Sequence, residues 1–361
     1  MKPARKLRIA LVGLGTWART GHLPLYKSPR FEPFVDIVAL CSRSRQKAGK
    51  WAKDFNIPQS YDDFEDLLHK EYLDAMVVCT PDHAHFDYIM AALETGLDVL
   101  VEKPMAMDLD QCRAIADKAM EKQKKVITLF HKRADPMWAE AGRRIRAGDF
   151  GAFRMGWAGI QNPVIVPNSD YFMSDLAAHT DPNWFLGTHF YDLLRYMTGL
   201  NPISVRAHRF PTHAPDNSSG NTDSIKADFI LENQGALSVF LSWNLSKQYP
   251  SLTKQDMRLH FDHAELDLDG TRRGFTQDFR DGYKYVNPYF MRETAAGVAG
   301  YAADFLEAAI ISLLDAKQAL PVDLPSIEDS WWASSVASAV EASAKALDYV
   351  NIEPFPLHLK Q

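Results

Sequence analysis

The chain has 361 residues, which is too many for one compact core and suits two domains. Hydrophobic residues make up 46% and charged residues 24% of the sequence, and the formal net charge is −6. An acidic chain of ordinary globular composition argues against nucleic-acid and membrane partners, because either would favour a basic face. The three cysteines, Cys41, Cys79 and Cys112, cannot all pair with one another. We therefore expect neither a disulfide nor a metal site.

The first apolar run, Leu7–Val12, is short and ends at a glycine. We interpret it as a strand rather than a signal peptide, and we expect the protein in a reducing cytoplasm. No apolar run approaches the ~20 residues that a membrane span needs.

Before residue 133, short apolar runs alternate with amphipathic helical patterns. The predicted strands are Leu7–Val12, Phe34–Cys41, Ala75–Cys79, Val99–Val101 and Val126–Phe130, and the predicted helices include Gln46–Phe55, Phe86–Glu94 and Gln111–Lys122. Strands that alternate with helices indicate βαβ units, because parallel strands need a crossover connection. We predict an α/β domain with a parallel sheet of the Rossmann type over residues 1–132.

Beyond residue 133 the alternating runs become longer. The predicted strands are Ala152–Ile160, Ile203–Phe210, Ser224–Leu231, Ala236–Trp243 and Met257–Leu268, and the predicted helices are Pro136–Ala147, Thr188–Met197, Ala295–Asp315 and Ser326–Tyr349. The segment Pro211–Asn221 is rich in turn-forming residues and is predicted to be an exposed connection. Residues 133–361 therefore predict an α+β domain with a mostly antiparallel sheet.

A glycine-rich turn, Gly13–Ala18, directly follows the first strand. In a dinucleotide fingerprint the first glycine makes a tight turn, the second lets the backbone approach a pyrophosphate, and a small third residue lets the helix pack on the strand. Glycines also end strands for purely structural reasons, but the position at the start of a βαβ series favours the binding role. The predicted phosphate-binding residues are Gly13, Gly15, Thr16, Trp17 and Ala18.

The ribose of such a dinucleotide would lie at the end of the second strand. Asp36 is at the expected spacing but begins that strand, at the wrong edge of the sheet. The strand instead ends before Ser42 and Arg43, which could hold a 2′-phosphate. This favours NADP over NAD as the cofactor, and the alternative is a solvated turn that caps the next helix.

Three further fragments carry a family resemblance: Thr80–His85, Glu102–Pro104 and Gly187–Asp192. With the glycine turn, they resemble the glucose–fructose oxidoreductase, inositol dehydrogenase and rhizopine-catabolism family (Gfo/Idh/MocA), and the resemblance spans most of the chain. It implies a Rossmann domain, a C-terminal α+β domain with an open-faced sheet, and homodimers or homotetramers built through that sheet.

Lys103 is the first catalytic residue that the resemblance implies. It follows a strand at the edge where open α/β sheets bind ligands, and Pro104 restricts its backbone to an extended form. An ammonium group there could stabilise a developing alkoxide. The alternative is a lysine in a surface loop with no role in catalysis. The resemblance also implies cofactor contacts from Thr80, Pro81, His85 and Glu102.

His189 is the second implied catalytic residue, as a general acid/base, unless one ring nitrogen merely bonds neighbouring backbone. Many family dehydrogenases have an aspartate four residues before this histidine, and here that position is Phe185. Asp181 and Asp192 are the nearest replacements in the sequence, and Asp175 lies further upstream. We favour Asp192, because its spacing puts it on the same helical face as His189.

Two other residues are candidate substrate contacts. Phe185, with Trp184, could form an apolar wall for one face of a sugar. Arg133 follows the last strand of the first domain, where family members often place substrate contacts, but a solvated basic turn is an equal alternative.

These observations predict an NAD(P)-dependent oxidoreductase that transfers a hydride between a nicotinamide and a carbinol carbon of a sugar, sugar derivative or cyclitol. One alternative is a glycoside hydrolase of the same family, in which tightly held NAD oxidises the sugar transiently. The other is a non-catalytic sensor that binds dinucleotide, although such relatives tend to lose the lysine found here at Lys103.

Overall fold

The computed structural model describes residues 5–168, 176–211, 222–280, 282–295, 297–315 and 318–359. The chain divides into two compact units: the first comprises Met1–Ala134 and Met291–Ser330, and the second comprises Asp135–Phe290 and Trp331–Gln361. The predicted boundary at residue 133 lies close to the first crossing point. Met291–Ser330, however, was assigned to the second domain and belongs to the first unit.

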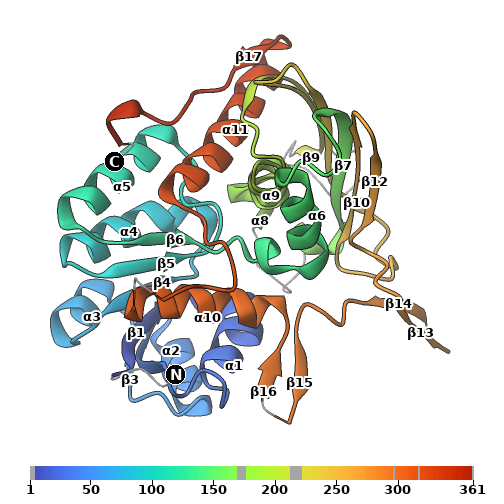
Figure 1. Cartoon of the computed structure of the whole chain (residues 1–361). Coiled ribbons are helices and arrows are strands. Elements are labelled where there is room, and N and C mark those ends of the chain that lie inside the picture. The colour runs from blue at the N-terminus through green and yellow to red at the C-terminus, as the bar shows by residue number, and fades with distance from the viewer. Residues whose placement is uncertain are drawn as a thin grey trace. The chain divides into compact units, whose positions relative to one another are not determined.

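The first unit is built on a six-stranded parallel sheet with the order β3-β2-β1-β4-β5-β6 (Figure 1). The strands are β1 Leu7–Val12, β2 Val35–Cys41, β3 Gln59–Tyr61, β4 Ala75–Val78, β5 Asp98–Val101 and β6 Val126–Thr128. The strand order reverses between β1 and β4, and ligands of open parallel sheets bind outside the carboxyl ends at such a point. The predicted Rossmann domain is confirmed.

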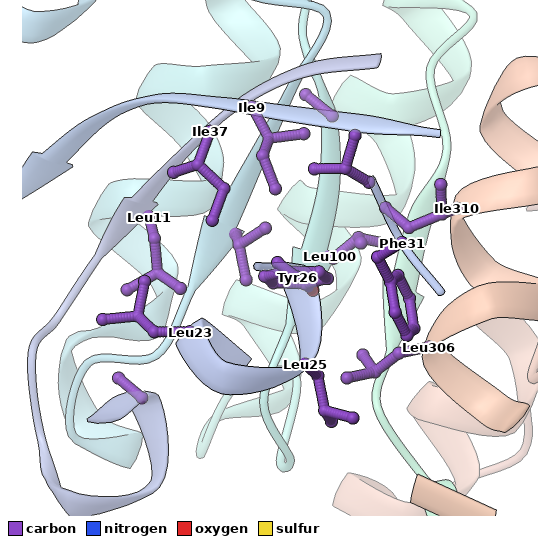
Figure 2. Close-up of a cluster of buried hydrophobic side chains, with 14 of the residues drawn as sticks. Ile9, Leu11, Leu23, Leu25, Tyr26, Phe31, Ile37, Leu100, Leu306 and Ile310 are labelled. Atoms are coloured by element: carbon purple, nitrogen blue, oxygen red, sulfur yellow. The ribbon is translucent and has the colours of Figure 1, made fainter. Parts of the chain in front are cut away.

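Helices cover both faces of this sheet because its strands are apolar on both sides. They are η1 Ala18–His22, α1 Leu23–Tyr26, α2 Arg45–Asp54, α3 Phe64–Lys70, η2 Asp82–Ala84, α4 His85–Glu94, α5 Leu109–Lys122, η3 His131–Ala134 and α10 Tyr301–Leu314. Leu306 and Ile310 of α10 pack with Ile9, Tyr26 and Phe31 in one buried cluster (Figure 2). This burial is why the late segment joins the first unit.

The second unit contains a seven-stranded sheet with the order β12-β11-β7-β10-β9-β8-β17. Its strands are β7 Phe153–Pro163, β8 Pro202–Pro211, β9 Thr222–Leu231, β10 Ala236–Leu245, β11 Lys254–Phe261, β12 Glu265–Asp269 and β17 Val350–Asn351. Strands β7 and β10 pair in parallel, and the other neighbours are antiparallel. The predicted, mostly antiparallel sheet is confirmed.

Helices lie on one face of this sheet in Figure 1. They include α6 Pro136–Arg146, α8 Leu176–His179, α9 Thr188–Thr198 and α11 Ile327–Ala346, whose first residues count with the first unit. The second unit also contains α7 Ile165–Asn168, η4 Asn183–Gly187 and the short η5 Leu357–Leu359. Buried and partly exposed residues alternate along β10 and β11, as expected for a sheet with one covered face. The other face exposes Met155 and Phe240, so the sheet is open-faced as predicted.

Three local predictions differ from the structure. Edge strand β3 was not predicted, because its three residues are polar or half-exposed. The single strand expected over Met257–Leu268 is a hairpin of β11 and β12. The helix expected over Ala295–Asp315 begins only at Tyr301, because Gly297 and Gly300 have φ values of 104° and 117° that no α-helix allows.

Two short hairpins complete the fold: β13 Phe275–Phe279 with β14 Gly282–Val286 in the second unit, and β15 Arg292–Thr294 with β16 Gly297–Ala299 in the first. Most of the predicted connection Pro211–Asn221 lies outside the described residues. Over the part of the chain that is described, no helix is both long and apolar enough to cross a bilayer.

Candidate functional site

The glycine turn lies at the switch point of the parallel sheet. Gly13 has a φ of 87°, and a Cβ atom on it would lie 2.5 Å from the backbone of Cys79 and Thr80, after β4. Only glycine fits there. A Cβ atom on Gly15 would meet nothing within 4 Å, so the backbone is open to a ligand at that position.

A helical run begins directly after this turn, at Thr16, and continues through η1 to Tyr26. No acidic residue lies in the first turn of η1. The N–H groups and the dipole of a helix start favour an anion, so the turn suits a pyrophosphate.

Lys103 follows β5 at the same edge of the sheet and is only 7% exposed. It is therefore not a lysine in a solvated loop. Burial lowers the pKa of its amine, and the charges of Asp82 and Glu102 oppose that shift. A buried amine at the carboxyl end of a parallel strand can donate a hydrogen bond to a reacting oxygen.

Glu102 contacts the helical run that follows the glycine turn. Trp17 donates its indole N–H to Glu102 Oε1 at 2.9 Å, and His22 Nε2 lies 2.7 Å from the same oxygen. His22 is fully buried. The predicted role of Glu102 is a cofactor contact, whereas His22 was not predicted, because no local sequence pattern links the two positions.

His131 packs between two aromatic rings of the first unit. Its ring stacks on Tyr301 at a centroid distance of 5.9 Å and lies 6.2 Å from the ring of Trp17. Burial lowers the pKa of His131 to about 4, and the charge of Lys132 acts in the same direction. The ring is therefore neutral near pH 7.

His85 uses both ring nitrogens within the protein. Nδ1 lies 2.7 Å from the carbonyl oxygen of Pro104, and Nε2 lies 2.9 Å from that of Thr80. His85 thus joins the segments that follow β4 and β5.

The side-chain hydroxyl of Thr80 has no such bond: its Oγ1 is buried and has no hydrogen-bond partner among the described residues. An orphaned hydroxyl beside the glycine turn suits a bound ligand.

The end of β2 carries Ser42 and Arg43 as predicted, whereas Asp36 pairs with Arg8 near the opposite edge of the sheet. Ser42 Oγ accepts the backbone N–H of Ser44 at 3.3 Å. Arg43 is exposed and forms no ion pair with any described residue. Its charge reaches Tyr88 on α4, where it opposes the rise in pKa that burial causes.

Arg133 is not a solvated turn residue. It is 4% exposed and lies 3.3 Å from the carboxylate of Asp329, at the start of α11. Both residues belong to the first unit. This ion pair holds the guanidinium within the first unit, and a substrate contact by Arg133 stays a prediction.

In the second unit, His189 is half-buried in the first turn of α9, and Asp192 lies one turn further with 2% of its surface exposed. The turn before the helix is fixed locally. Thr188 donates its hydroxyl to the carbonyl oxygen of Trp184 at 2.7 Å, and Tyr191 donates to Asn183 Oδ1 at 2.7 Å.

Asp181 is part of this support. Oδ1 accepts the backbone N–H groups of Asn183 and Trp184, and Oδ2 accepts from Arg209. Burial raises the pKa of this carboxyl, and the charge of Arg209 opposes the rise. Both oxygens are thus used within the protein, which favours Asp192 over Asp181 as the replacement for the missing aspartate. Asp175 lies outside the described residues.

Phe185 is part of an aromatic pair rather than a polar site. Its ring meets that of Trp243 edge to face, with centroids 5.8 Å apart. Trp243 is 3% exposed, and its indole N–H has no acceptor among the described residues. The pair supplies an apolar surface with one unsatisfied donor beside it.

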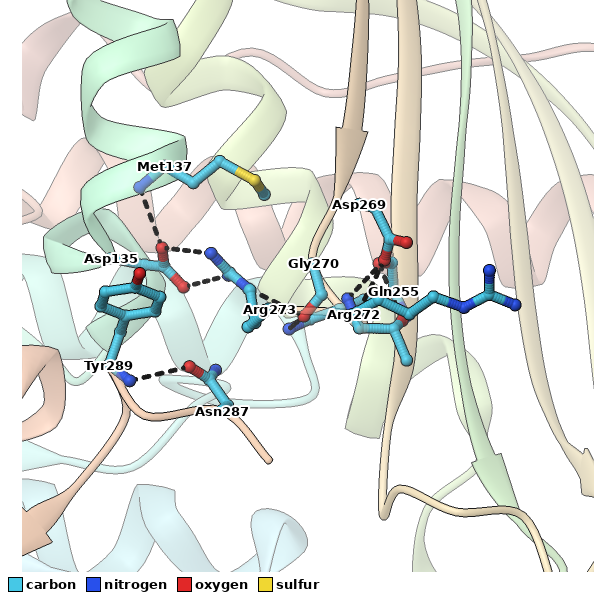
Figure 3. Close-up of polar contacts among 10 residues, drawn as sticks. Asp135, Met137, Gln255, Asp269, Gly270, Arg272, Arg273, Asn287 and Tyr289 are labelled. Carbon is cyan, nitrogen blue, oxygen red and sulfur yellow. Dashed lines mark hydrogen bonds and ion pairs between the residues drawn. The ribbon is translucent and has the colours of Figure 1, made fainter. Parts of the chain in front are cut away.

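A buried ion pair fixes the start of α6, which packs against α9. Asp135 caps α6 through the N–H of Met137 and accepts two hydrogen bonds from Arg273, at 3.2 and 2.5 Å (Figure 3). Arg273 also donates to the carbonyl oxygen of Gly270. Both charged side chains are at most 5% exposed.

The parallel sheet and the glycine turn at its switch point define a nucleotide-binding protein of the Rossmann class. Residues 7–130 match the profile of the family described as "Oxidoreductase family, NAD-binding Rossmann fold" (Gfo/Idh/MocA). No group of three or more histidine, cysteine, aspartate or glutamate residues in the described ranges could hold a metal ion.

Two curated proteins of similar sequence are named as dehydrogenases. The chain is 28% identical over 203 residues to scyllo-inositol 2-dehydrogenase (NAD(+)) of Bacillus subtilis (strain 168), a match that covers 56% of this chain and 57% of that protein. It is 27% identical over 215 residues to D-glucoside 3-dehydrogenase of Escherichia coli (strain K12), covering 59% and 60% respectively. The matches thus span less than two thirds of both relatives.

A solved structure matches the fold over a longer range. Scyllo-inositol dehydrogenase from Lactobacillus casei, with bound NAD(H) and scyllo-inositol, superposes with a TM-score of 0.77 at 18% identity, covering 96% of this chain and 99% of that one. The match of residues 7–130 to the Gfo/Idh/MocA family model confirms the predicted resemblance over the Rossmann region, and the solved structure shows that the similarity in fold extends over the rest of the chain.

Proposed function

We propose that this protein is a nicotinamide-dependent dehydrogenase that acts on a secondary hydroxyl group of a cyclitol or sugar. The observation that carries the proposal is the buried Lys103, which follows β5 at the same sheet edge as the glycine turn. The family assignment supports a nicotinamide dinucleotide as cofactor. The names of the curated relatives support inositols and glucosides as the substrate class.

The residues at the switch point fit the cofactor. Gly13, Gly15 and the helix start at Thr16 would hold the pyrophosphate, and the orphaned hydroxyl of Thr80 would find a partner on the dinucleotide. The bound nicotinamide supplies the acceptor or donor of the hydride. We further propose NADP(H) over NAD(H), because Ser42 and Arg43 stand where a ribose-binding carboxylate would otherwise lie.

Lys103 and His189 would handle the proton of the reacting hydroxyl. In the direction of alcohol oxidation, the Lys103 ammonium donates a hydrogen bond to the carbinol oxygen and stabilises its growing negative charge. The imidazole of His189 accepts the proton as the O–H bond breaks. The carbon–oxygen double bond forms as the C–H electron pair leaves.

The Phe185–Trp243 pair would contact the substrate where many relatives have an aspartate. An aromatic edge suits the apolar C–H face of a cyclitol or pyranose ring, and the Trp243 N–H could donate to one hydroxyl. We also propose a homodimer or homotetramer in which a second copy covers Met155 and Phe240 of the open sheet face. Light scattering of the purified protein tests the subunit number.

A panel of substrates tests the proposed reaction. The protein is mixed with NAD+ or NADP+ and with myo-inositol, scyllo-inositol, glucosides or free aldoses, and the absorbance of reduced nicotinamide is followed. At least one polyol should give stoichiometric reduction. Release of the aglycone from a glucoside without net reduction would instead favour the hydrolase alternative, and inactivity toward the whole panel would contradict the proposal.

A further inference from the structure

The carboxylate of Glu102 accepts two N–H groups on one oxygen. Trp17 Nε1 lies 2.9 Å and His22 Nε2 lies 2.7 Å from Oε1. Because the pKa of the Glu102 carboxyl is lowered, the group is an ionised carboxylate near pH 7, which only accepts hydrogen bonds, so Nε2 of His22 carries the hydrogen. The other ring nitrogen of His22 lies 3.4 Å from the Tyr26 hydroxyl, which can donate to it.

The two donors belong to one element and their acceptor to another. Trp17 and His22 lie in the helical run that starts at the glycine turn, whereas Glu102 follows β5 and immediately precedes Lys103. The three side chains therefore tie the phosphate-binding helix to the segment that carries the catalytic lysine. The exposed fraction of the Glu102 side chain is 15% and that of His22 is 1%, so water competes little for these bonds.

Charge also connects Glu102 to Lys103. Burial alone would raise the pKa of the Glu102 carboxyl, but the hydrogen bond from His22 and the charge of Lys103 contribute to lowering it overall. Burial lowers the pKa of Lys103, and Asp82 of η2 and Glu102 oppose this. His131 of η3 also faces the pair, but it is neutral near pH 7 because its pKa is about 4.

We propose that Glu102 is a positioning residue: held by His22 and Trp17, its carboxylate keeps the Lys103 amine protonated and fixed relative to the glycine turn. The proposal rests on the proposed function for what Lys103 does in the reaction. The state of Lys103 itself can be measured without any reaction.

Competitive acetylation of the whole protein over a series of pH values, read by mass spectrometry, gives the midpoint of deprotonation of each lysine. Glu102→Gln keeps the shape and an acceptor oxygen but removes the charge. It should lower the Lys103 midpoint, because the lost negative charge is one of those that oppose the effect of burial on the Lys103 amine. Glu102→Asp should recover part of that shift. The matched control is Glu32→Gln, which removes a carboxylate from an exposed ion pair with Lys6 and should leave Lys103 unchanged.

The two donors are tested in the same way. His22→Gln and Trp17→Phe each remove or displace one hydrogen bond to Glu102, and each should lower the Lys103 midpoint by less than Glu102→Gln does. Both should also weaken dinucleotide binding, measured by titration, because the helix after the glycine turn loses its tie to β5. If Glu102→Gln does not fold, the Lys103 midpoints of these two variants test the proposal instead.

An unchanged Lys103 midpoint in a folded Glu102→Gln protein, or an equal shift in Glu32→Gln, overturns the inference. So does an unchanged midpoint in both His22→Gln and Trp17→Phe, should they be the only folded variants. Failure of the proposed function is a separate result. If the midpoints shift as expected but no polyol is oxidised, Glu102 still controls Lys103 and only the reaction assigned to Lys103 is refuted.

Discussion

Arg43 lies just beyond β2 and forms no ion pair in the described part of the chain, so its guanidinium is available to a ligand. If it holds the 2′-phosphate, Arg43→Ala should weaken NADP(H) binding by about 1.5–3 kcal/mol, the value of a charged hydrogen bond, and affect NAD(H) little. Titration of both nucleotides measures the difference. Arg45→Ala is the control. Arg45 is a neighbouring, highly exposed arginine that already has a carboxylate partner, with 3.8 Å between its guanidinium and the Asp62 carboxylate. Equal losses for both nucleotides would reject the 2′-phosphate role.

Asp192 is the carboxylate that we expect to replace the aspartate missing at Phe185. It is buried one helical turn after His189. Asp192→Asn should lower kcat/KM by roughly 10²-fold and flatten the rise of rate with pH through the histidine range. Asp181→Asn should mainly reduce stability, because the Asp181 carboxylate bonds Arg209 and two backbone N–H groups. A fully active Asp192→Asn protein would show that the compensating group lies elsewhere.

Residues whose role depends on local sequence were predictable, and residues whose partners are distant were not. Gly13 and Lys103 stand in fixed positions after strands, so their places followed from the strand pattern. Arg133 and Asp181 form ion pairs with Asp329 and Arg209, and nothing near them in the sequence indicates those partners. His22 was missed for the same reason, because it lies in the helical run after the glycine turn and its partner Glu102 follows β5.

At the level of elements, the two glycines of the turn should behave differently. Gly13→Ala forces a Cβ atom into the backbone after β4 at an unfavourable φ, so it should lower both the melting temperature and dinucleotide affinity. Gly15→Ala adds a methyl group in open space, so it should weaken binding without lowering the melting temperature. Thermal unfolding and nucleotide titration separate the two effects. If Gly15→Ala binds as tightly as wild type, the backbone there does not approach the cofactor.

The start of α6 depends on the buried pair of Asp135 and Arg273. Arg273→Met leaves the Asp135 carboxylate buried without its partner and should cost about 3–5 kcal/mol in the free energy of unfolding of the second unit. Arg258→Met is the matched control, because Arg258 pairs with Asp267 at the surface, where a pair contributes about 0–1 kcal/mol. Urea unfolding measures both. Similar losses in the two variants would contradict the structural role of the buried pair.

The spacing of apolar residues predicted most helices and strands. It predicted neither which distant strands pair nor where the two units divide. The alternation in β10 and β11 predicts one buried face, but the parallel pairing of β7 with β10 is a property of the folded sheet. The apolar residues of α10 likewise predict a buried helix without indicating which core buries it. In the structure that core is the one around β1.

At the scale of the whole molecule, the chain completes its first unit only after building most of the second. The glycine turn, Lys103 and Glu102 belong to the first unit, whereas His189, Asp192 and the Phe185–Trp243 pair belong to the second. The proposed cofactor contacts thus belong to the first unit, and the proposed aromatic substrate contacts belong to the second.

Transfer of deuterium from a carbinol carbon to nicotinamide, measured by mass spectrometry with a C-deuterated cyclitol or sugar, tests this account most directly. The wild-type protein should place the label on the reduced nicotinamide. Lys103→Met should slow transfer by roughly 10²-fold or more while changing dinucleotide affinity little, and Lys118→Met, which removes a surface ion pair with Glu94, should transfer label normally. Absence of label with every polyol that binds, or near-normal transfer by Lys103→Met, would contradict the proposed reaction.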